Sequence, residues 1–360
     1  MRKIVNSERL EKAMQQKAIL INLPPAPGYS YSSAGTIYPA TGILVIGSVL
    51  KNRGIKVKVI DGALRNNYIQ ETLESIDKDT SFIGFSVMTS QVTMAFKLSK
   101  IIKEKHHNIP VIWGGVHPIL FPEQTVLNPN IDIVVTGDGC ETILNLINHI
   151  EGSTSLKEVK GIGFKDDSGK AFFTEIGTPD NINNIPHIDF SILDDIEIYL
   201  SARSAYQREI VSDNCEKLRV MPVLTGLGCS YKCQFCINVI LERKYRFRQA
   251  DSIISEIKRL KNKYDANSFI FYDEDFLISK KRLIEFLDLI EQENLKFYWR
   301  IWTRVNYFRE NYLNRDLIVR LGKNGLRSVA MGAESGSQRI LDLIQKGIKV
   351  ENILHSAKML

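Results

Sequence analysis

The sequence has few cysteines and no long apolar segment. Its 360 residues include five cysteines, an odd number that does not fit the disulfide framework of a secreted domain. The longest apolar run, residues 40–50, falls well short of the ~20 residues that cross a bilayer, and we expect it to form a buried helix. Polar residues 6–11 stand where a signal peptide places its apolar core. These absences predict no export signal and no membrane span, and they favour a cytoplasmic protein.

The chain also lacks a strong excess of charge. Lysine and arginine number 47 against 41 aspartates and glutamates, which gives a net charge of +6. This value is modest for the length and does not by itself indicate a nucleic-acid partner, so we expect a small-molecule or peptide substrate instead. With 44% hydrophobic and 24% charged residues, the composition is that of a globular protein with room for two domains.

Apolar strands alternate with helical patterns in residues 1–150. We expect strands at residues 18–23, 56–60, 82–87, 111–113 and 132–136, and helices at residues 43–52, 94–104 and 142–150. Such alternation predicts a doubly wound parallel sheet, in which ligands bind beyond the carboxyl ends of the strands. The Gly-x-Gly-x-x-Gly fingerprint is absent after the first strand, which disfavours a nicotinamide site.

The rest of the chain divides into a linker and a second α/β domain. Residues 151–220 contain two short strands around an Asp-Ser-Gly turn, which predicts a linker with a hairpin. In residues 221–360, further strands and helices alternate as in a β/α barrel. Only four barrel strands are expected before Leu360, so this barrel is expected to be partial and truncated at its C-terminus.

Three cysteines stand close together at the start of this second domain. Cys229, Cys233 and Cys236 form a Cys-x3-Cys-x2-Cys triplet, and the nearest other sulfur, Cys215, lies outside any usual zinc-finger spacing. Structural zinc normally has four protein ligands, so the site is one ligand short. A [4Fe-4S] cluster tolerates that deficit, because its fourth iron can bind a substrate. A zinc site or chance thiols remain the alternative.

This triplet resembles that of radical S-adenosylmethionine (SAM) enzymes. The resemblance implies that Cys229, Cys233 and Cys236 hold a [4Fe-4S] cluster whose open iron chelates SAM. It implies that one electron, from a donor such as flavodoxin or ferredoxin, cleaves SAM to a 5′-deoxyadenosyl radical that takes hydrogen from the substrate. It also implies that Phe235 packs near the adenine of SAM.

The first domain resembles the Rossmann-like cobalamin-binding domain that precedes the radical SAM core in one large subclass. The resemblance rests on four motifs, which are Leu23-Pro-Pro25, Gly54 with Val59-Ile-Asp61, Gly114-Gly-Val-His-Pro118 and Gly137-Asp-Gly-Cys-Glu141. It implies base-off cobalamin, since the loop after the first strand has no histidine to ligate cobalt. The cobalamin-binding residues that it predicts are Ser86, Gly115 and Gly137. His117 is either a ligand or, as we favour, a turn-stabilising residue.

Two acidic clusters follow expected barrel strands. By resemblance, Asp273 and Glu274 meet the amino group of SAM, and Glu334 contacts its methionine or ribose part. Solvated turns are the alternative for each cluster. Arg304, which ends another strand, is expected to pair with the SAM carboxylate or Glu334, or to form a surface ion pair.

The resemblance to cobalamin-dependent radical SAM enzymes implies methylation of an unactivated carbon as the reaction. Ring closure or rearrangement without net methyl transfer is one alternative. A catalytically inactive, corrinoid-binding fragment is another, because the barrel is expected to be incomplete. A zinc-stabilised nucleic-acid module is a third, suggested only by the cysteines and the charge.

Overall fold

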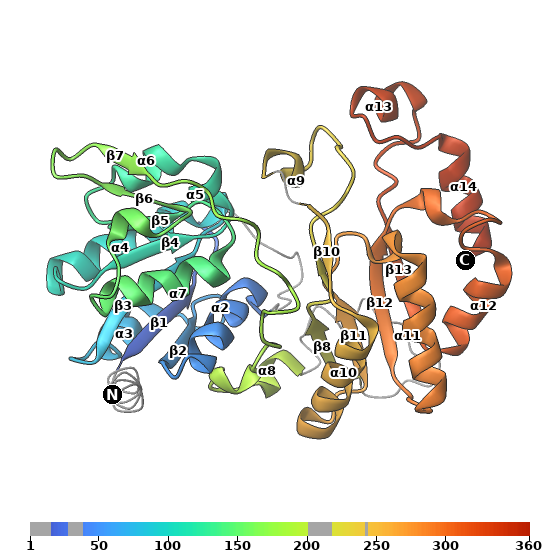
Figure 1. The fold of residues 1–360 in the computed structure, drawn as a ribbon, viewed down its shortest axis with the longest axis horizontal. Coiled ribbons are helices and arrows are strands. Elements are labelled where there is room, and N and C mark those ends of the chain that lie inside the picture. The colour runs from blue at the N-terminus through green and yellow to red at the C-terminus, as the bar shows by residue number, and fades with distance from the viewer. Residues whose placement is uncertain (1–15, 28–38, 201–217, 242–243) are drawn as a thin grey trace. The chain divides into compact units, whose positions relative to one another are not determined.

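The computed structural model describes residues 16–27, 39–200, 218–241 and 244–360. These residues form two compact units (Figure 1). The first runs to Asp180 and includes residues 184–196, and the second comprises residues 181–183 and 197–360. Cys215 and most of the loop after the first strand lie outside the described residues.

A seven-stranded sheet forms the centre of the first unit in the described part of the chain. The strand order is β2-β1-β3-β4-β5-β6-β7, and the pairs from β2 to β5 are parallel. The five parallel strands are β1 (Lys17–Asn22), β2 (Lys56–Asp61), β3 (Thr80–Ser86), β4 (Val111–Gly114) and β5 (Ile133–Val135). The predicted doubly wound parallel sheet is therefore confirmed.

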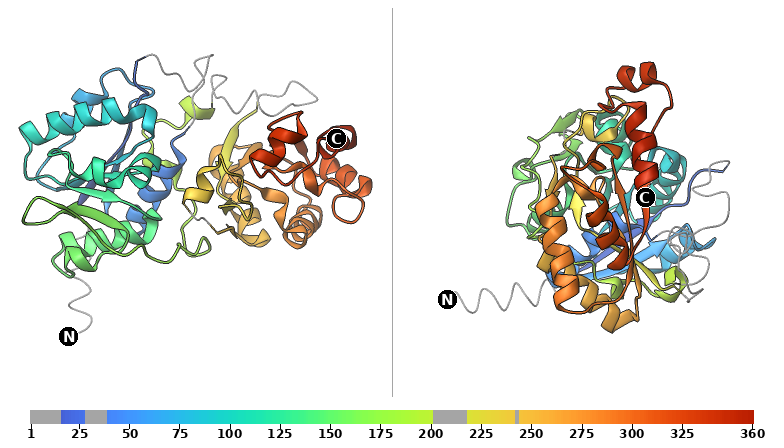
Figure 2. Two further views of the ribbon diagram at one scale, coloured as in Figure 1. Left: turned by 90° about the horizontal axis from the view of Figure 1, so that it is seen from above. Right: turned by 90° about the vertical axis from the view of Figure 1, so that its right-hand side faces the viewer.

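Helices cover both faces of this sheet (Figures 1 and 2). The helices between and beside the strands are α2 (Thr41–Asn52), α3 (Tyr68–Glu74), α4 (Val92–Lys105), α5 (Val116–Leu120), α6 (Pro122–Val126) and α7 (Gly139–Ile150). Successive strand residues point to opposite faces. Ile19 and Ile21 accordingly enter the core that α4 covers, whereas Leu20 faces Gly47 of α2.

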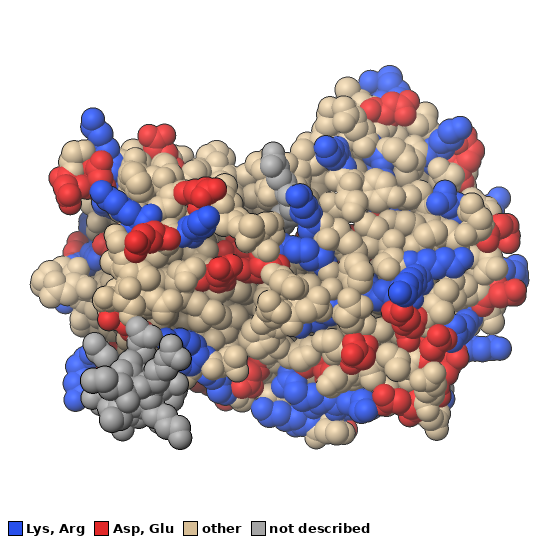
Figure 3. All heavy atoms as spheres, viewed as in Figure 1, with Lys and Arg blue, Asp and Glu red and all other residues tan. Residues whose placement is uncertain are grey.

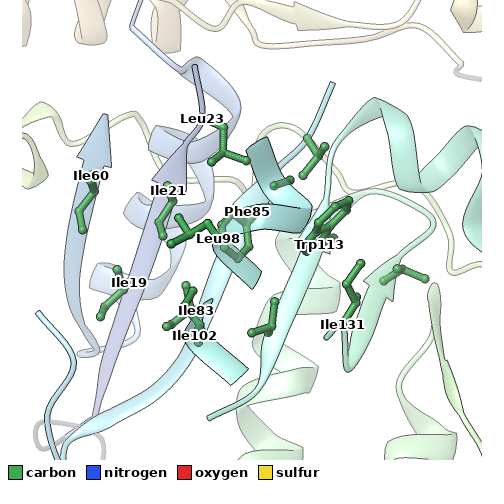
Figure 4. Close-up of a cluster of buried hydrophobic side chains, with 14 of the residues drawn as sticks. Ile19, Ile21, Leu23, Ile60, Ile83, Phe85, Leu98, Ile102, Trp113 and Ile131 are labelled. Atoms are coloured by element: carbon green, nitrogen blue, oxygen red, sulfur yellow. The ribbon is translucent and has the colours of Figure 1, made fainter. Parts of the chain in front are cut away.

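The core on the α4 side is a continuous apolar cluster (Figure 4). Its largest member, Trp113, is fully buried, and its indole N–H donates to Ser99 Oγ of α4 at 3.0 Å. This hydrogen bond satisfies the polar atom that a buried tryptophan brings into the core. The cluster holds the central strands together directly beneath the strand ends where ligands bind in such sheets.

The predicted hairpin exists, but it is part of the first sheet. Its strands β6 (Ile162–Lys165) and β7 (Ala171–Phe173) pair antiparallel, and β6 also pairs antiparallel with β5. The side chain of Asp166 accepts the backbone N–H groups of Ser168 and Lys170 within the turn. The hairpin thus extends the sheet of the first unit, a contact that local sequence pattern does not indicate.

The second unit is built around a parallel sheet of four strands in the described residues. The strand order is β13-β12-β11-β8, with β8 (Val220–Val223), β11 (Ser268–Phe271), β12 (Tyr298–Thr303) and β13 (Leu326–Met331). The intervening helices are α10 (Ala250–Tyr264), α11 (Lys280–Gln292) and α12 (Arg315–Lys323), followed by α13 (Gln338–Leu343) and α14 (Val350–Met359). These repeated β/α units are the predicted partial barrel.

Short elements near the cysteines were not predicted. A two-stranded antiparallel ribbon pairs β9 (Gly226–Leu227) with β10 (Arg246–Phe247), and α9 (Ile237–Ile240) begins directly after Cys236. They are too short to show a periodic apolar pattern. Within the described ranges, no helix is both long and apolar enough to span a bilayer.

Candidate functional site

The loops after β3 and β4 meet at the carboxyl edge of the first sheet. Ser86 and Gly114 are register partners, and the backbone N–H of Val87 donates to the Gly114 carbonyl at 2.8 Å. Gly115 has φ +94°, and a Cβ added there would lie 2.7 Å from the nitrogen of Val87. Only glycine fits this close approach of two backbones. The structure therefore brings the predicted residues Ser86 and Gly115 together.

Gly137 lies in the loop after β5, beyond the next strand of the same sheet edge. Its loop continues into α7, where the Asp180 carboxylate accepts the backbone N–H groups of Cys140 and Glu141 at 3.0 and 3.2 Å. This carboxylate occupies the amino end of the helix. The Asp180 carboxylate thus balances the partial positive charge at the amino end of α7, so this end needs no bound anion.

His117 is buried in the first turn of α5, directly after the loop that follows β4. Its backbone N–H donates to the Val87 carbonyl at 2.9 Å, and its Nδ1 lies 3.3 Å from Thr89 Oγ1. Burial lowers the pKa of its imidazole below the usual value. These contacts support the interpretation of His117 as a turn-stabilising residue.

The three cysteines of the triplet lie in one loop between β9 and α9. Cys233 is buried, whereas Cys229 and Cys236 are half-buried. The N–H of Cys236 donates to the Cys233 carbonyl at 2.9 Å, and burial raises the pKa of the Cys229 thiol. Among the described residues, no three histidine, cysteine or acidic side chains converge on one metal ion. A cubane does not require such convergence, because each thiolate binds a different iron.

Arg304 connects the cysteine loop to the barrel. Its Nη1 donates to Cys233 Sγ at 3.3 Å, and its guanidinium lies 3.6 Å from the ring centroid of Tyr231. Its Nη2 donates to the carbonyl oxygen of Lys346, and its Nε to Asn306 Oδ1. The expected pairing with Glu334 and the surface ion pair are both wrong, because Arg304 is 5% exposed and contacts the cysteine loop instead.

The two acidic residues predicted after β11 have different surroundings. Asp273 is buried and accepts hydrogen bonds from the Thr225 hydroxyl, from Tyr245 at 3.2 Å and from Arg282 Nη2 at 2.7 Å. A Cβ on Gly226 would lie 2.5 Å from this carboxylate. Glu274 is exposed. The structure thus holds Asp273 in a buried ion pair and turns Glu274 outward.

Asp275 is the acidic residue of this loop that the sequence interpretation missed as a site candidate. It is fully buried, and it accepts hydrogen bonds from Thr303 Oγ1 at 3.0 Å and the Tyr307 hydroxyl at 2.7 Å. Burial raises the pKa of its carboxyl to about 6, although these two donors and the charge of Arg304 act to lower it. The strand-end position was visible in the sequence, but its burial was not.

Glu334 forms an ion pair with Lys346. The Lys346 ammonium donates to Glu334 Oε1 at 2.8 Å and lies 5.7 Å from the ring centroid of Phe235. Glu334 has φ +62°, a left-handed conformation that a non-glycine residue adopts rarely. Phe235 is 56% exposed, so its ring is available for stacking. The sequence did not indicate a role for Lys346, which is one of many lysines. Tyr231 was notable only for its place between Cys229 and Cys233.

The charged residues on the surface are mixed in sign. Lys and Arg lie among Asp and Glu over the face shown in Figure 3. This mixture agrees with the modest net charge of +6.

Two family models match the chain, one in each unit. A model described as B12 binding domain matches residues 31–147, and one described as Radical SAM superfamily matches residues 223–360. The second match begins at Val223 in β8 and therefore includes the cysteine loop and all the strands that follow it.

The chain is similar to characterised and uncharacterised relatives and to a solved structure. An uncharacterized methyltransferase of Pyrococcus horikoshii is 29% identical over 350 residues, covering 96% of this chain and 71% of the relative. An anaerobic magnesium-protoporphyrin IX monomethyl ester cyclase of Rubrivivax gelatinosus is 26% identical, covering 90% and 56%. The cobalamin-dependent radical enzyme OxsB superposes with a TM-score of 0.74 at 20% identity, over 96% of this chain and 47% of OxsB. The chain thus spans about half the length of the solved structure that it matches.

Proposed function

The chain belongs to the cobalamin-dependent radical SAM enzymes, and we propose that it methylates an unactivated carbon of a small-molecule or peptide substrate. The observation that carries this proposal is the pairing of a B12-binding domain with a loop of three cysteines in a radical SAM barrel. The methyltransferase from Pyrococcus horikoshii supports methyl transfer as the reaction. We propose residues 1–150, 151–220 and 221–360 as the cobalamin-binding domain, the linker and the radical SAM core, with the hairpin of the linker joined to the sheet of the first domain.

The described residues fit the cofactors of the family. Three thiols in one loop suit a [4Fe-4S] cluster, in which three cysteines hold three of the irons and the fourth iron stays open. We propose that Cys229, Cys233 and Cys236 hold this cluster. When bound, the cluster supplies the electron that cleaves SAM, and the corrinoid carries the methyl group.

The proposed SAM site lies around the cysteine loop. Glu334 has one carboxylate oxygen bonded to Lys346, and this leaves acceptor capacity for a SAM hydroxyl or ammonium. Phe235 offers an exposed ring to the adenine. Asp273 and Glu274 stay predicted contacts of the SAM amino group. Asp273 is the less available of the two for binding SAM, because it already forms a buried ion pair with Arg282.

The corrinoid site that we propose lies at the carboxyl edge of the first sheet. Ser86 and Gly115 are adjacent there, and Gly137 follows a neighbouring strand. The backbones at Gly115 and Val87 lie too close together for a side chain at position 115. Because no side chain projects there, a flat ligand can approach the strand ends closely. We further propose a reducing, cytoplasmic environment, an electron donor such as flavodoxin or ferredoxin, and no nucleic-acid partner.

Cleavage of SAM tests the proposal. Anaerobically reconstituted protein, reduced with dithionite and given trideuteromethyl-SAM, is expected to form 5′-deoxyadenosine and to transfer the label to its bound corrinoid. Formation of 5′-deoxyadenosine without label on the corrinoid would favour the second candidate, ring closure, which the cyclase of Rubrivivax gelatinosus supports. Full iron content with no cleavage would instead indicate an inactive corrinoid-binding chain, and zinc in place of iron would contradict the proposed metal centre.

Substitution of Gly115 tests the corrinoid site. Gly115→Ala is expected to weaken binding of hydroxocobalamin by at least about tenfold, which corresponds to ~1.4 kcal/mol, because a Cβ would separate the backbones at Val87. Gly54→Ala is a matched control: its φ of +93° imposes the same backbone strain, but no atom lies within 4 Å of the added Cβ. Absorbance titration measures both affinities. Equal affinities of the two variants would show that the corrinoid does not depend on this close approach.

A further inference from the structure

We propose that Arg304 sets the reduction potential of the iron–sulfur cluster through its hydrogen bond to Cys233. This inference rests on the proposed function, because it requires Cys233 to be a cluster ligand. The Nη1 of Arg304 lies 3.3 Å from Cys233 Sγ, and both side chains are buried. In this proposal Arg304 acts through Cys233, so it is a positioning residue.

The guanidinium of Arg304 is held in place from several sides. It stacks on the ring of Tyr231, which stands between two of the cysteines, and the Tyr231 hydroxyl accepts a hydrogen bond from Asn306 Nδ2 at 2.7 Å. Asn306 in turn accepts the Nε–H of Arg304 at 3.2 Å. This ring of contacts orients the remaining N–H groups toward Cys233 and the Lys346 carbonyl. The donor is therefore already aligned with the sulfur.

The charge of Arg304 is not neutralised by an ion pair. Among the described residues, no carboxylate forms a salt bridge with it, and Glu334 pairs with Lys346 instead. The nearby Asp275 accepts its hydrogen bonds from Thr303 and Tyr307. A buried cation without a salt-bridge partner interacts strongly with a charge that develops on a neighbouring group, because the surrounding dielectric constant is low.

The effect on the cluster follows from charge. Reduction adds one negative charge, and the potential of a cluster depends on net charge and on hydrogen bonds to its sulfurs. A cation that donates to a ligand sulfur stabilises the reduced form more than the oxidised form. Arg304 should therefore raise the potential and ease the reduction that precedes SAM cleavage.

Arg304 also supports the loop mechanically, and the test must separate the two roles. Its Nη2 donates to the Lys346 carbonyl, and the N–H of Gln234 donates to the Ile344 carbonyl at 3.0 Å. These bonds hold the connection between α13 and α14 against the cysteine loop. A purely structural role predicts loss of iron on substitution, without a change in the potential of the clusters that remain.

A potentiometric titration followed by electron paramagnetic resonance tests the inference on the whole reconstituted chain without SAM. In Arg304→Gln, the ratio of reduced to oxidised cluster at a fixed potential is expected to fall about tenfold, equivalent to a shift of about 59 mV to lower potential for one electron. Arg304→Lys keeps the charge but loses the planar fork, so a smaller shift in the same direction is expected. Arg300→Gln removes a cation from β12, the strand that ends directly before Arg304, where Arg300 contacts Ser328 and Trp302, and is expected to leave the potential unchanged.

Three results would overturn the inference. The first is an unchanged potential in Arg304→Gln at full iron content. The second is loss of iron from both Arg304 variants with the potential of the residual cluster unchanged, which would assign Arg304 a structural role. The third is an equal shift in Arg300→Gln, which would reduce the effect to general surface charge. If the unsubstituted chain binds no iron–sulfur cluster, the proposed function itself fails, and iron analysis identifies that case before any variant is compared.

Discussion

Cys233→Ser is expected to reduce formation of 5′-deoxyadenosine from SAM by more than about 100-fold, because replacing even the partners of metal ligands costs about 10- to 100-fold. Cys233 is the buried member of the triplet and accepts the hydrogen bond from Arg304. A serine hydroxyl still accepts that bond, so the loop should keep its fold while the thiolate is lost. Anaerobic reconstitution followed by iron analysis and chromatography of the nucleoside products measures both effects.

Cys140→Ser is the matched control for Cys233→Ser. Cys140 lies in the first unit, at the start of α7, where its backbone N–H contacts Asp180. It is not part of the triplet, so the protein is expected to keep its iron and its cluster absorbance. If Cys233→Ser retained a full cluster with undiminished SAM cleavage, the assignment of the three cysteines as ligands would be wrong.

Asp273→Ala is expected to lower the free energy of unfolding of the second unit by about 3–5 kcal/mol, because it leaves a buried charge without its partner. The side chains of Asp273 and Arg282 are 0% and 1% exposed, and their ion pair is 2.7 Å long. Within the described part of the chain, Arg282 would retain the carbonyl oxygens of Thr225 and Phe276 as acceptors. Urea denaturation followed by tryptophan fluorescence in a Trp113→Phe background reports on this unit, because Trp299 and Trp302, both on β12, are then the fluorescent tryptophans.

Two further variants make the test of Asp273 specific. Glu285→Ala removes an exposed ion pair with Lys281 on α11, the helix that carries Arg282, and should cost less than about 0.5 kcal/mol. Asp273→Asn keeps an acceptor of similar shape, so it should destabilise less than alanine. If Asp273→Asn left stability unchanged but weakened SAM binding, the carboxylate would act on the ligand and not on the fold.

Local sequence pattern was enough to predict most of the architecture. Apolar runs such as residues 18–23 and 268–272 specify buried parallel strands, because both faces of these strands are covered. The elements that escaped prediction, such as β9, β10 and α9, are only two to four residues long. Their pairing depends on neighbours that are distant in the sequence. The hairpin was visible from its turn, but its attachment to β5 was not.

The spacing of Cys229, Cys233 and Cys236 was enough by itself to predict a metal centre, because three thiols so close in sequence lie in one loop and are one ligand short of a structural zinc site. Tertiary structure alone decided which charged groups surround that loop. Arg304 reaches Cys233 across 71 positions of sequence, and Asp273 rather than Asp275 received the buried arginine. Strand register and loop packing decide how deeply each of these charged side chains is buried and which distant residues it contacts. Burial and such contacts change the energy of a charge far more than its neighbours along the chain do.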